Sequence, residues 1–238
     1  MKSVLITGGS RGIGREMVAA FCKAGYSVAF TYKSSEDKAK ELALETGAFA
    51  IRADAESEDE IRSAVALAAD RLRGIDCLIN NAGVAAFSLF TDISLSEWNR
   101  VMNINLTSAF LYSKYAIPYM INKKWGRIIN ISSMWGLVGS SCEVHYSTAK
   151  AGLIGMTKAL AKELGPSGIT VNAIAPGVID TDMNASLSAE IIDALIEETP
   201  VSRIGLPEDV AEAALFLAGE GSSFITGDVI NVSGGFVV

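Results

Sequence analysis

The hydrophobic positions along this chain follow two different periods. Short runs rich in β-branched residues alternate with longer stretches in which apolar residues recur every three or four positions. The short runs predict seven strands, and the longer stretches predict the helices that connect them. The predicted strands are Ser3–Thr7, Ser27–Tyr32, Ala48–Arg52, Cys77–Asn80, Arg127–Ser132, Thr170–Ala173 and Val229–Val232. The predicted helices are Ile13–Lys23, Asp37–Glu45, Glu58–Arg71, Leu95–Lys123, Tyr146–Leu164 and Pro207–Leu217.

The order of these elements predicts an α/β fold. Strands that alternate with helices form βαβ units, and continuous apolar strands are buried on both faces. We therefore expect a single-domain, Rossmann-like, doubly wound fold over residues 1–238, with a seven-stranded parallel sheet and helices on both faces. Residues 178–202 form a longer stretch with one short amphipathic helix, and we expect a lid on the substrate side there.

Some helix ends have local causes. Ser57 precedes an acidic first turn and should cap the helix that follows, and Ser94 should do the same for the next helix. The predicted helix Leu95–Lys123 is long. We expect it to break near Asn105 and to bend at Pro118.

Composition and charge exclude several classes of function. The chain has 238 residues, half of them hydrophobic, which is enough for one substantial core. Its net charge of −7 is spread along the sequence without a basic stripe, so a nucleic-acid partner is not expected. The apolar runs are too short to cross a membrane, and the start of the chain has no signal-peptide pattern.

The cysteines bear on the cellular compartment. Cys22, Cys77 and Cys142 are odd in number and far apart. This pattern predicts neither a disulfide framework nor a metal site, and it fits a reducing cytoplasm.

A glycine-rich turn follows the first predicted strand. The segment Thr7-Gly8-Gly9-Ser10-Arg11-Gly12-Ile13-Gly14 leads directly from strand to helix. Backbone N–H groups at a helix N-terminus bind phosphate, and glycines let a pyrophosphate approach the backbone. An ordinary glycine-rich turn is the alternative, because such patterns also occur by chance. The position between strand and helix favours a dinucleotide site.

The end of the second predicted strand bears on the choice of dinucleotide. In the commoner fingerprint an acidic residue there binds the ribose 2′-hydroxyl of NAD. This strand ends Phe30-Thr31-Tyr32-Lys33-Ser34-Ser35 and lacks the acid. Arg11 and Lys33 offer two cations to a 2′-phosphate, which favours NADP(H). Taken alone, Lys33 is equally well explained as a solvated loop lysine.

Tyr146 and Lys150 are a candidate proton-transfer pair. They are four positions apart in a predicted helix, so their side chains project from the same face. A neighbouring ammonium lowers the pKa of a phenol, which would make the tyrosine a usable acid near neutral pH. The same spacing is common on helix surfaces, so its weight depends on the other motifs. The side chain of His145 points about 100° away from that of Tyr146 around the helix axis, and we expect no catalytic role for it.

The motifs together resemble the classical short-chain dehydrogenase/reductase family, nearly from end to end. They are the turn Thr7–Gly14, the segment Asn80-Asn81-Ala82-Gly83, Asn105 within Asn103-Ile104-Asn105-Leu106, Ser133 ahead of Tyr146, and Pro176-Gly177 followed by Thr181. Several of these motifs follow predicted strands. A parallel sheet would therefore bring them together at one edge, where ligands bind in doubly wound folds.

The resemblance implies a mechanism. NADPH would deliver hydride to a carbonyl carbon, while Tyr146 donates a proton to the developing oxyanion and Ser133 hydrogen-bonds to the same oxygen. Lys150 would lower the pKa of Tyr146 and hold the nicotinamide ribose, and Asn105 would position a water that returns protons. The implied cofactor contacts are Gly8, Ser10, Arg11, Gly12, Ile13, Gly14, Tyr32, Lys33, Ser34, Asp54, Ala55, Asn81, Ala82, Gly83, Tyr146, Lys150, Pro176, Gly177, Ile179 and Thr181.

Within the family, the chain most resembles bacterial 3-oxoacyl-[acyl-carrier-protein] reductases. The segments Gly9–Arg15, Lys150–Gly155 and Ile225–Ile230 carry this resemblance. It implies NADPH-dependent reduction of a 3-oxoacyl thioester of acyl carrier protein or coenzyme A, in fatty acid biosynthesis. Two positions depart from the subgroup: Ser167 stands where many members have a basic residue, and Ser233 stands where Asp is usual. Docking of an acidic carrier protein therefore needs a test.

Two other functions stay open. The segments that resemble the subgroup mostly serve cofactor and core, so an NADP(H)-dependent reductase of another ketone, sugar or alcohol would share many of them. A non-catalytic nucleotide-binding protein is the other alternative. It would be free to lose Ser133, Tyr146 or Lys150, and this chain has all three.

The end of the chain predicts assembly into an oligomer. Residues Gly234–Val238 carry no charged side chain, and the small residues Ala149, Gly152 and Gly155 suit close packing of a helix. We expect a homo-oligomer, and the family resemblance implies a homotetramer.

Overall fold

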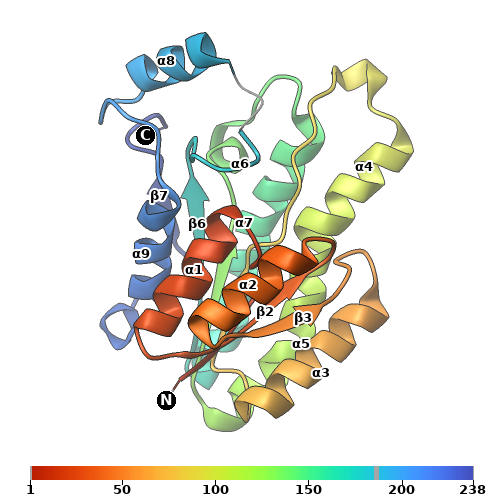
Figure 1. Ribbon diagram of the computed structural model, residues 1–238, viewed down its shortest axis with the longest axis vertical. Helices are drawn as coiled ribbons and strands as arrows, with labels where there is room; N and C mark the ends of the chain where they lie inside the picture. Colours follow the sequence, from red (N-terminus) through yellow and green to blue (C-terminus); the bar gives the residue numbers. More distant parts are fainter. Residues whose placement is uncertain (1, 185–187, 238) are drawn as a thin grey trace.

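One parallel sheet organises the chain in the computed structural model, which describes residues 2–184 and 188–237. All seven predicted strands are present, and they pair in the order β3-β2-β1-β4-β5-β6-β7 (Figure 1). The α/β prediction is therefore confirmed. The strands are β1 (Ser3–Ile6), β2 (Ser27–Tyr32), β3 (Phe49–Arg52), β4 (Cys77–Asn80), β5 (Gly126–Ile131), β6 (Ile169–Pro176) and β7 (Val229–Val232).

The helices follow the prediction, including the break of Leu95–Lys123 near Asn105, with two differences beyond shifts of one residue at their ends. They are α1 (Gly12–Lys23), α2 (Glu36–Thr46), α3 (Glu58–Leu72), α4 (Leu95–Met102), α5 (Ser108–Lys123), α6 (Trp135–Val138), α7 (Val144–Leu164), α8 (Ala189–Glu198) and α9 (Pro207–Ala218). The short helix α6 was not predicted, and α7 begins two residues earlier than expected. The predicted helix Leu95–Lys123 is divided into α4 and α5, and Pro118 lies inside α5.

The division between α4 and α5 is a π-helical turn over Asn103–Thr107. The side-chain amide of Asn105 donates a hydrogen bond of 2.9 Å to the carbonyl of Val101, four residues earlier. In a regular α-helix that carbonyl would accept the backbone N–H of residue 105. A side chain that takes over such a bond locally widens the helix, which explains the break predicted near Asn105.

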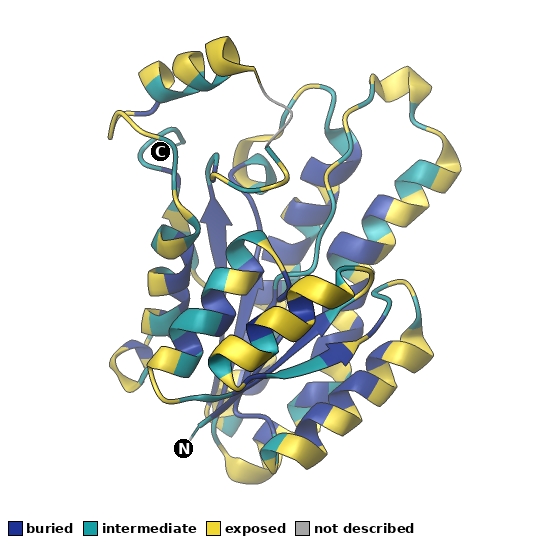
Figure 2. Cartoon of the chain, viewed as in Figure 1, coloured by how far each residue is buried: buried dark blue, intermediate teal, exposed yellow. Residues whose placement is uncertain are grey.

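Two hydrophobic layers cover the two faces of the sheet. In β1, Val4 and Ile6 pack into a cluster with residues of α1, α2 and α9, whereas Leu5 packs into a second cluster with residues of α3, α5 and α7. This alternation is the period of two expected for a strand that is covered on both faces. Figure 2 shows the buried strands between helices whose outer faces are exposed.

Two predicted helix caps are present. The hydroxyl of Ser57 accepts the backbone N–H of Glu60 at 3.3 Å, at the start of α3. The hydroxyl of Ser94 accepts the backbone N–H of Glu97 at 3.1 Å, at the start of α4. Each bond satisfies one of the backbone donors that a helix start leaves free.

The loops at the carboxyl ends of the strands are larger than those at the amino ends. They include α6, α8 and the start of α4, which extend beyond the sheet at the top of Figure 1. The described parts of the segment predicted as a lid, residues 178–184 and 188–202, lie here and contain α8, and the role of a lid stays a prediction. In the described ranges, no helix combines the length and the apolar character needed to cross a bilayer.

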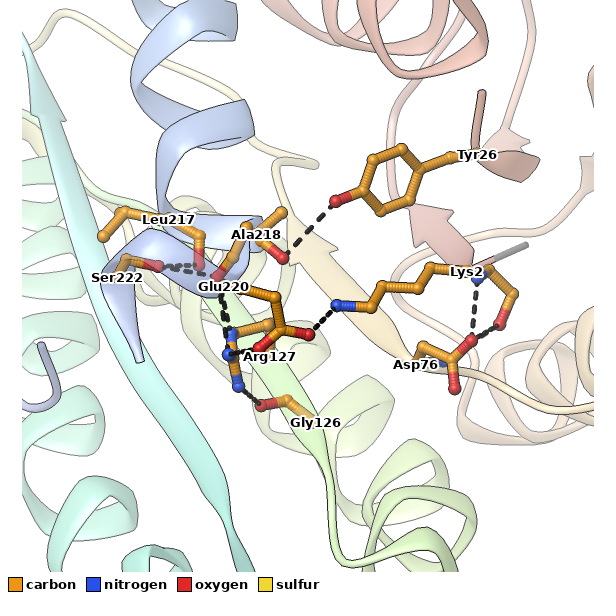
Figure 3. A network of polar contacts seen from close by, with 11 residues as sticks. Lys2, Tyr26, Asp76, Gly126, Arg127, Leu217, Ala218, Glu220 and Ser222 are labelled. Atoms are coloured by element: carbon orange, nitrogen blue, oxygen red, sulfur yellow. Dashed lines mark hydrogen bonds and ion pairs between the residues drawn. The ribbon is translucent and has the colours of Figure 1, made fainter. Parts of the chain in front are cut away.

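The amino ends of the strands carry a polar network instead (Figure 3). Asp76, just before β4, accepts the backbone N–H of Ser3 at 2.8 Å and forms an ion pair of 2.6 Å with Lys123 of α5. Lys2 forms an ion pair with Glu220, which follows α9. These contacts join β1, β4, α5 and α9 at the edge opposite the carboxyl-end loops.

Arg127 of β5 is a buried, charged member of this network. Its side chain is only 3% exposed, and its guanidinium donates hydrogen bonds to the carbonyls of Gly126 at 2.9 Å and Gly219 at 3.4 Å. The exposed carboxylate of Glu220 lies 3.7 Å away. The guanidinium also lies over the ring of Trp125, 4.3 Å from its centre.

We predict that Arg127 matters more for stability than its ion-pair partner does. Arg127→Met removes the donor for two carbonyls and should lower the free energy of unfolding by about 2 kcal/mol. Glu220→Gln should lower the free energy of unfolding by less than Arg127→Met does, because the Glu220 side chain is 69% exposed and water screens the pair. Urea unfolding at one fixed protein concentration measures both values, and the reverse ranking would contradict the assignment.

Candidate active site

A cavity of about 680 Å³ opens at the carboxyl edge of the sheet. All the residues expected from the resemblance to contact the cofactor line it, and so do Ser133, Tyr146 and Lys150. Asn105 is the one candidate that does not line it. The topology therefore brings together motifs that are up to about 170 residues apart in sequence, as expected for a parallel sheet.

Hydrogen bonds join the glycine-rich turn after β1 to the segment after β4. The hydroxyl of Thr7 accepts the backbone N–H groups of Asn81 and Ala82, both at 2.9 Å. In return, the side-chain amide of Asn81 donates to the carbonyl of Thr7 at 2.9 Å and to that of Gly8 at 3.1 Å. These bonds fix the relative position of two walls of the cavity.

Gly14 allows the first turn of α1 to pack against the preceding loop. A Cβ atom at this position would lie 2.2 Å from the carbonyl oxygen of Gly8 and 2.7 Å from the side-chain nitrogen of Asn81. No side chain fits there. Gly12, Ile13 and Gly14 of this turn line the cavity, and the first turn of α1 contains no acidic residue that would compete for its free N–H groups.

The charge of the cavity is opposite in sign to that of the chain. Among the described lining residues, Arg11, Lys33, Arg100 and Lys150 are cationic, and Asp54 and Asp182 are anionic. The whole chain has a net charge of −7. A local excess of cations in an acidic protein, next to a helix N-terminus, suits a ligand with several phosphates.

Ser133, Tyr146 and Lys150 form the buried polar end of the cavity. Ser133 follows the end of β5, and Tyr146 and Lys150 lie one turn apart on α7, as the spacing predicts. The Lys150 ammonium donates a hydrogen bond of 2.9 Å to the carbonyl of Ile131, and it lies 5.6 Å from the centre of the Tyr146 ring. The adjacent Ser132 hydroxyl donates to the Lys150 carbonyl at 2.9 Å, so it holds α7 against β5.

Burial, rather than mutual attraction, dominates the acid–base properties of Tyr146 and Lys150. It raises the pKa of Tyr146 to about 12, although a hydrogen bond with Ser133 acts in the opposite direction. It also lowers the pKa of Lys150 to about 8. In this structure burial outweighs any lowering of the pKa of Tyr146 by Lys150, so the shift toward neutrality that the resemblance implies stays a prediction. The spacing predicted that the two side chains are close, but it carried no information about how far both are removed from water.

Asn105 lies directly behind the cavity wall. Its side chain exchanges two hydrogen bonds with the backbone of Val84: it accepts the N–H at 3.2 Å and donates to the carbonyl at 2.9 Å. A Cβ atom at Gly83 would lie 2.7 Å from the Asn105 oxygen and 3.3 Å from the Lys150 ammonium. Gly83 therefore lies between Asn105 and Lys150, and its lack of a side chain lets both approach its backbone.

Lys33 lies at the opposite end of the cavity and is not free. Its ammonium lies 2.8 Å from a carboxylate oxygen of Asp54 and 3.1 Å from one of Glu56. Arg11, the second cation assigned to this end, is exposed and precedes α1 directly. The sequence predicted the two cations but did not indicate the two carboxylates beside one of them.

Several lining residues were not among the predicted catalytic or cofactor-binding residues, although the last three belong to the segment predicted as a lid. They are Thr31, Ser35, Ala53, Val84, Ala85, Arg100, Ile104, Tyr112, Ile131, Ser132, Asp182, Met183 and Asn184. Most of them adjoin a predicted residue, so extending each motif by one or two positions would have found them. Arg100 had no such indication, because it is one turn before the π-helical segment of a helix whose path was unknown.

His145 is fully buried beside Tyr146. Within the described part of the chain, neither ring nitrogen has a hydrogen-bond partner, and the nearest carboxylate oxygen belongs to Glu97 of α4 at 3.8 Å. His145 does not line the cavity, in keeping with the non-catalytic role expected for it. The described residues contain no group of three or more His, Cys, Asp or Glu side chains placed to bind a metal ion.

Comparison with known proteins finds a matching family model and relatives that share one name. A family model described as "Enoyl-(Acyl carrier protein) reductase" matches residues 8–237. A protein of Aquifex aeolicus named 3-oxoacyl-[acyl-carrier-protein] reductase FabG is 46% identical over 98% of this chain and 96% of its own length. Proteins of the same name from Chlamydia trachomatis and Staphylococcus aureus are 41% and 39% identical, again over 98% of this chain and over 96% and 97% of their own lengths.

We predict that the pKa of Lys150 limits activity at alkaline pH. Because this pKa is about 8, the ammonium loses its proton as the pH rises through that value, whereas Tyr146, with a pKa of about 12, keeps its proton. The kcat/KM for reduction of a carbonyl substrate should therefore fall above about pH 8. A pH profile that stays flat to pH 9.5 would show that the Lys150 charge is not required.

Proposed function

We propose, since this chain belongs to the short-chain dehydrogenase/reductase family, that it uses NADPH to reduce the 3-oxo group of an acyl thioester to a 3-hydroxy group. The observation that carries the proposal is the convergence of Ser133, Tyr146 and Lys150 on the buried end of a cavity that begins at a glycine-rich turn. The relatives named 3-oxoacyl-[acyl-carrier-protein] reductase support this substrate class and a place in fatty acid biosynthesis.

The residues at the buried end have complementary tasks. Tyr146 holds its proton at neutral pH and donates it to the carbonyl oxygen as negative charge develops there. The Ser133 hydroxyl donates a second hydrogen bond to the same oxygen, and these two donors stabilise the developing oxyanion. The Lys150 ammonium stabilises the charge left on Tyr146, and Asn105, behind Gly83, positions a water that returns protons to this end of the cavity.

The cofactor supplies the hydride and fits the remainder of the cavity. The N–H groups at the start of α1, where Gly12, Ile13 and Gly14 line the cavity, would hold its pyrophosphate. Arg11 and Lys33 would bind the 2′-phosphate, and Asp54 and Ala55 would contact the adenine. Pro176, Gly177, Ile179 and Thr181 line the cavity and would contact the nicotinamide end.

Residues 178–202 serve as the lid over the acyl chain. Met183 lines the cavity and is half exposed, and Ile191 of α8 is 48% exposed. An acyl chain between α8 and the cavity would cover both side chains. The names of the relatives support acyl carrier protein as the carrier of the substrate, and coenzyme A is the alternative carrier. A cytoplasmic reaction suits the three free cysteines.

A substrate panel tests this function. With NADPH, we expect turnover of acetoacetyl thioesters of acyl carrier protein and of coenzyme A. Tyr146→Phe should lower kcat by roughly 10²–10⁴ because it removes the proton donor, while NADPH binding, measured by calorimetry, stays intact.

The panel also contains an enoyl thioester, simple ketones and sugars. Turnover of one of these, without turnover of either acetoacetyl thioester, would assign the protein to a different reaction. Full activity of Tyr146→Phe would refute the catalytic role of Tyr146 whatever the substrate.

The preference for NADPH over NADH should be at least about tenfold in kcat/KM, since a charge-assisted contact with the 2′-phosphate is worth about 1.5–3 kcal/mol. Lys33→Asp should reduce or invert this preference, because it places a carboxylate next to the phosphate and offers an acceptor to the ribose hydroxyl of NADH. Kinetics with both cofactors measure the ratio. An unchanged ratio in Lys33→Asp would remove Lys33 from the phosphate site.

The protein acts as a homotetramer. Phe224 is completely exposed and Phe216 of α9 is half exposed. A Cβ atom at Gly155 of α7 would meet nothing within 4 Å, so a neighbouring helix has room to approach. Sedimentation at micromolar concentration should give four times the chain mass of 25.1 kDa, whereas a 25.1 kDa species alone would contradict assembly.

A further inference from the structure

Lys33 stands between two carboxylates at the end of the cavity proposed for the 2′-phosphate. Its ammonium is 2.8 Å from Asp54 and 3.1 Å from Glu56, and its side chain is 52% exposed. Both carboxylates belong to the loop after β3, next to the carboxyl end of β2 that carries Lys33. One cation is thus paired with two anions.

The two carboxylates differ in their other contacts. Asp54 lines the cavity, and its second oxygen accepts the backbone N–H of Glu56 at 3.0 Å. Glu56 does not line the cavity, and among the described contacts its side chain bonds to Lys33 alone. Glu56 can therefore lose its charge without altering the wall of the cavity or the loop that forms it.

The charge of Lys33 is already compensated before any ligand binds. Two carboxylates, those of Asp54 and Glu56, lie within 3.1 Å of its ammonium. A 2′-phosphate adds further negative charge, so it has to compete with Glu56 for the Lys33 ammonium. The hydrogen bonds from Asp54 and Glu56 raise the pKa of Lys33, in keeping with an ammonium that both carboxylates hold.

We propose that Glu56 is a specificity-determining residue that limits the preference for NADPH: it holds Lys33 in an ion pair that the 2′-phosphate must displace. This inference rests on the proposed use of NADPH. NADH has a hydroxyl in place of the phosphate and does not need the Lys33 ammonium. Glu56 therefore weakens the binding of NADPH and leaves the binding of NADH unchanged. The wild-type protein consequently discriminates less strongly than its two cations would allow.

Glu56→Gln tests this directly. The substitution keeps the size of the side chain and removes its charge, and it should tighten NADPH binding by roughly two- to fivefold, the range for partly exposed ion pairs. The Kd for NADH should not change. Calorimetric titration of the protein without substrate measures both constants, and the gain for NADPH should shrink as the salt concentration rises.

Two controls separate this mechanism from a general change of charge. Glu58→Gln removes an equal charge two residues away, from a side chain that contacts Lys114 and Tyr115 instead, and it should leave the Kd for NADPH unchanged. In the background of Lys33→Met, Glu56→Gln should no longer tighten NADPH binding, because the effect acts through Lys33.

The outcomes distinguish this inference from the proposed function. If the wild-type protein binds NADPH no more tightly than NADH, the proposed cofactor is wrong. If it prefers NADPH but Glu56→Gln leaves the Kd unchanged or weakens binding, then Glu56 does not compete with the phosphate, and this inference alone is overturned.

Discussion

The burial of one parallel sheet on both faces is the constraint on which the rest of this molecule depends. In a parallel sheet each strand is followed by a crossover, usually a helix, that returns the chain to the end of the sheet where the strands begin. All strands therefore finish at the opposite end of the sheet. The amino ends of the strands are closed by short turns and by the ion pairs around Arg127 and Asp76. The loops that follow the strands gather at the carboxyl ends of the sheet, and the cavity forms between these loops.

Desolvation is what makes the chemical groups in this cavity unusual. Tyr146 and Lys150 are both buried among β5, α7 and the segment after β4, and burial disfavours the charged form of each. As a result, Tyr146 holds its proton strongly, whereas the neighbouring Lys150 holds its proton weakly. At the other end of the cavity, Lys33 is half exposed and its charge is balanced by carboxylates rather than removed from water. One cavity therefore uses two different means to control its cations.

The sequence predicted the sheet, the motifs and their common edge because each of these depends on local pattern. Strand periodicity, the turn Thr7–Gly14 and the spacing of Tyr146 and Lys150 are all visible within a few residues. The carboxylates beside Lys33, the effect of burial on Tyr146 and the exposure of Arg100 to the cavity depend on contacts between distant segments. No local pattern encodes such contacts, so these features became visible only with the fold.

The side chain of Asn105 is shared between two structural tasks. It takes the Val101 carbonyl out of the helix, and it binds both backbone groups of Val84 in the cavity wall. One amide therefore supports both the π-helical turn between α4 and α5 and the cavity wall at Val84. Replacing Asn105 removes the hydrogen bonds of both places at once. A loss of activity in such a variant would therefore report on the structure of this junction as much as on any water molecule that Asn105 positions.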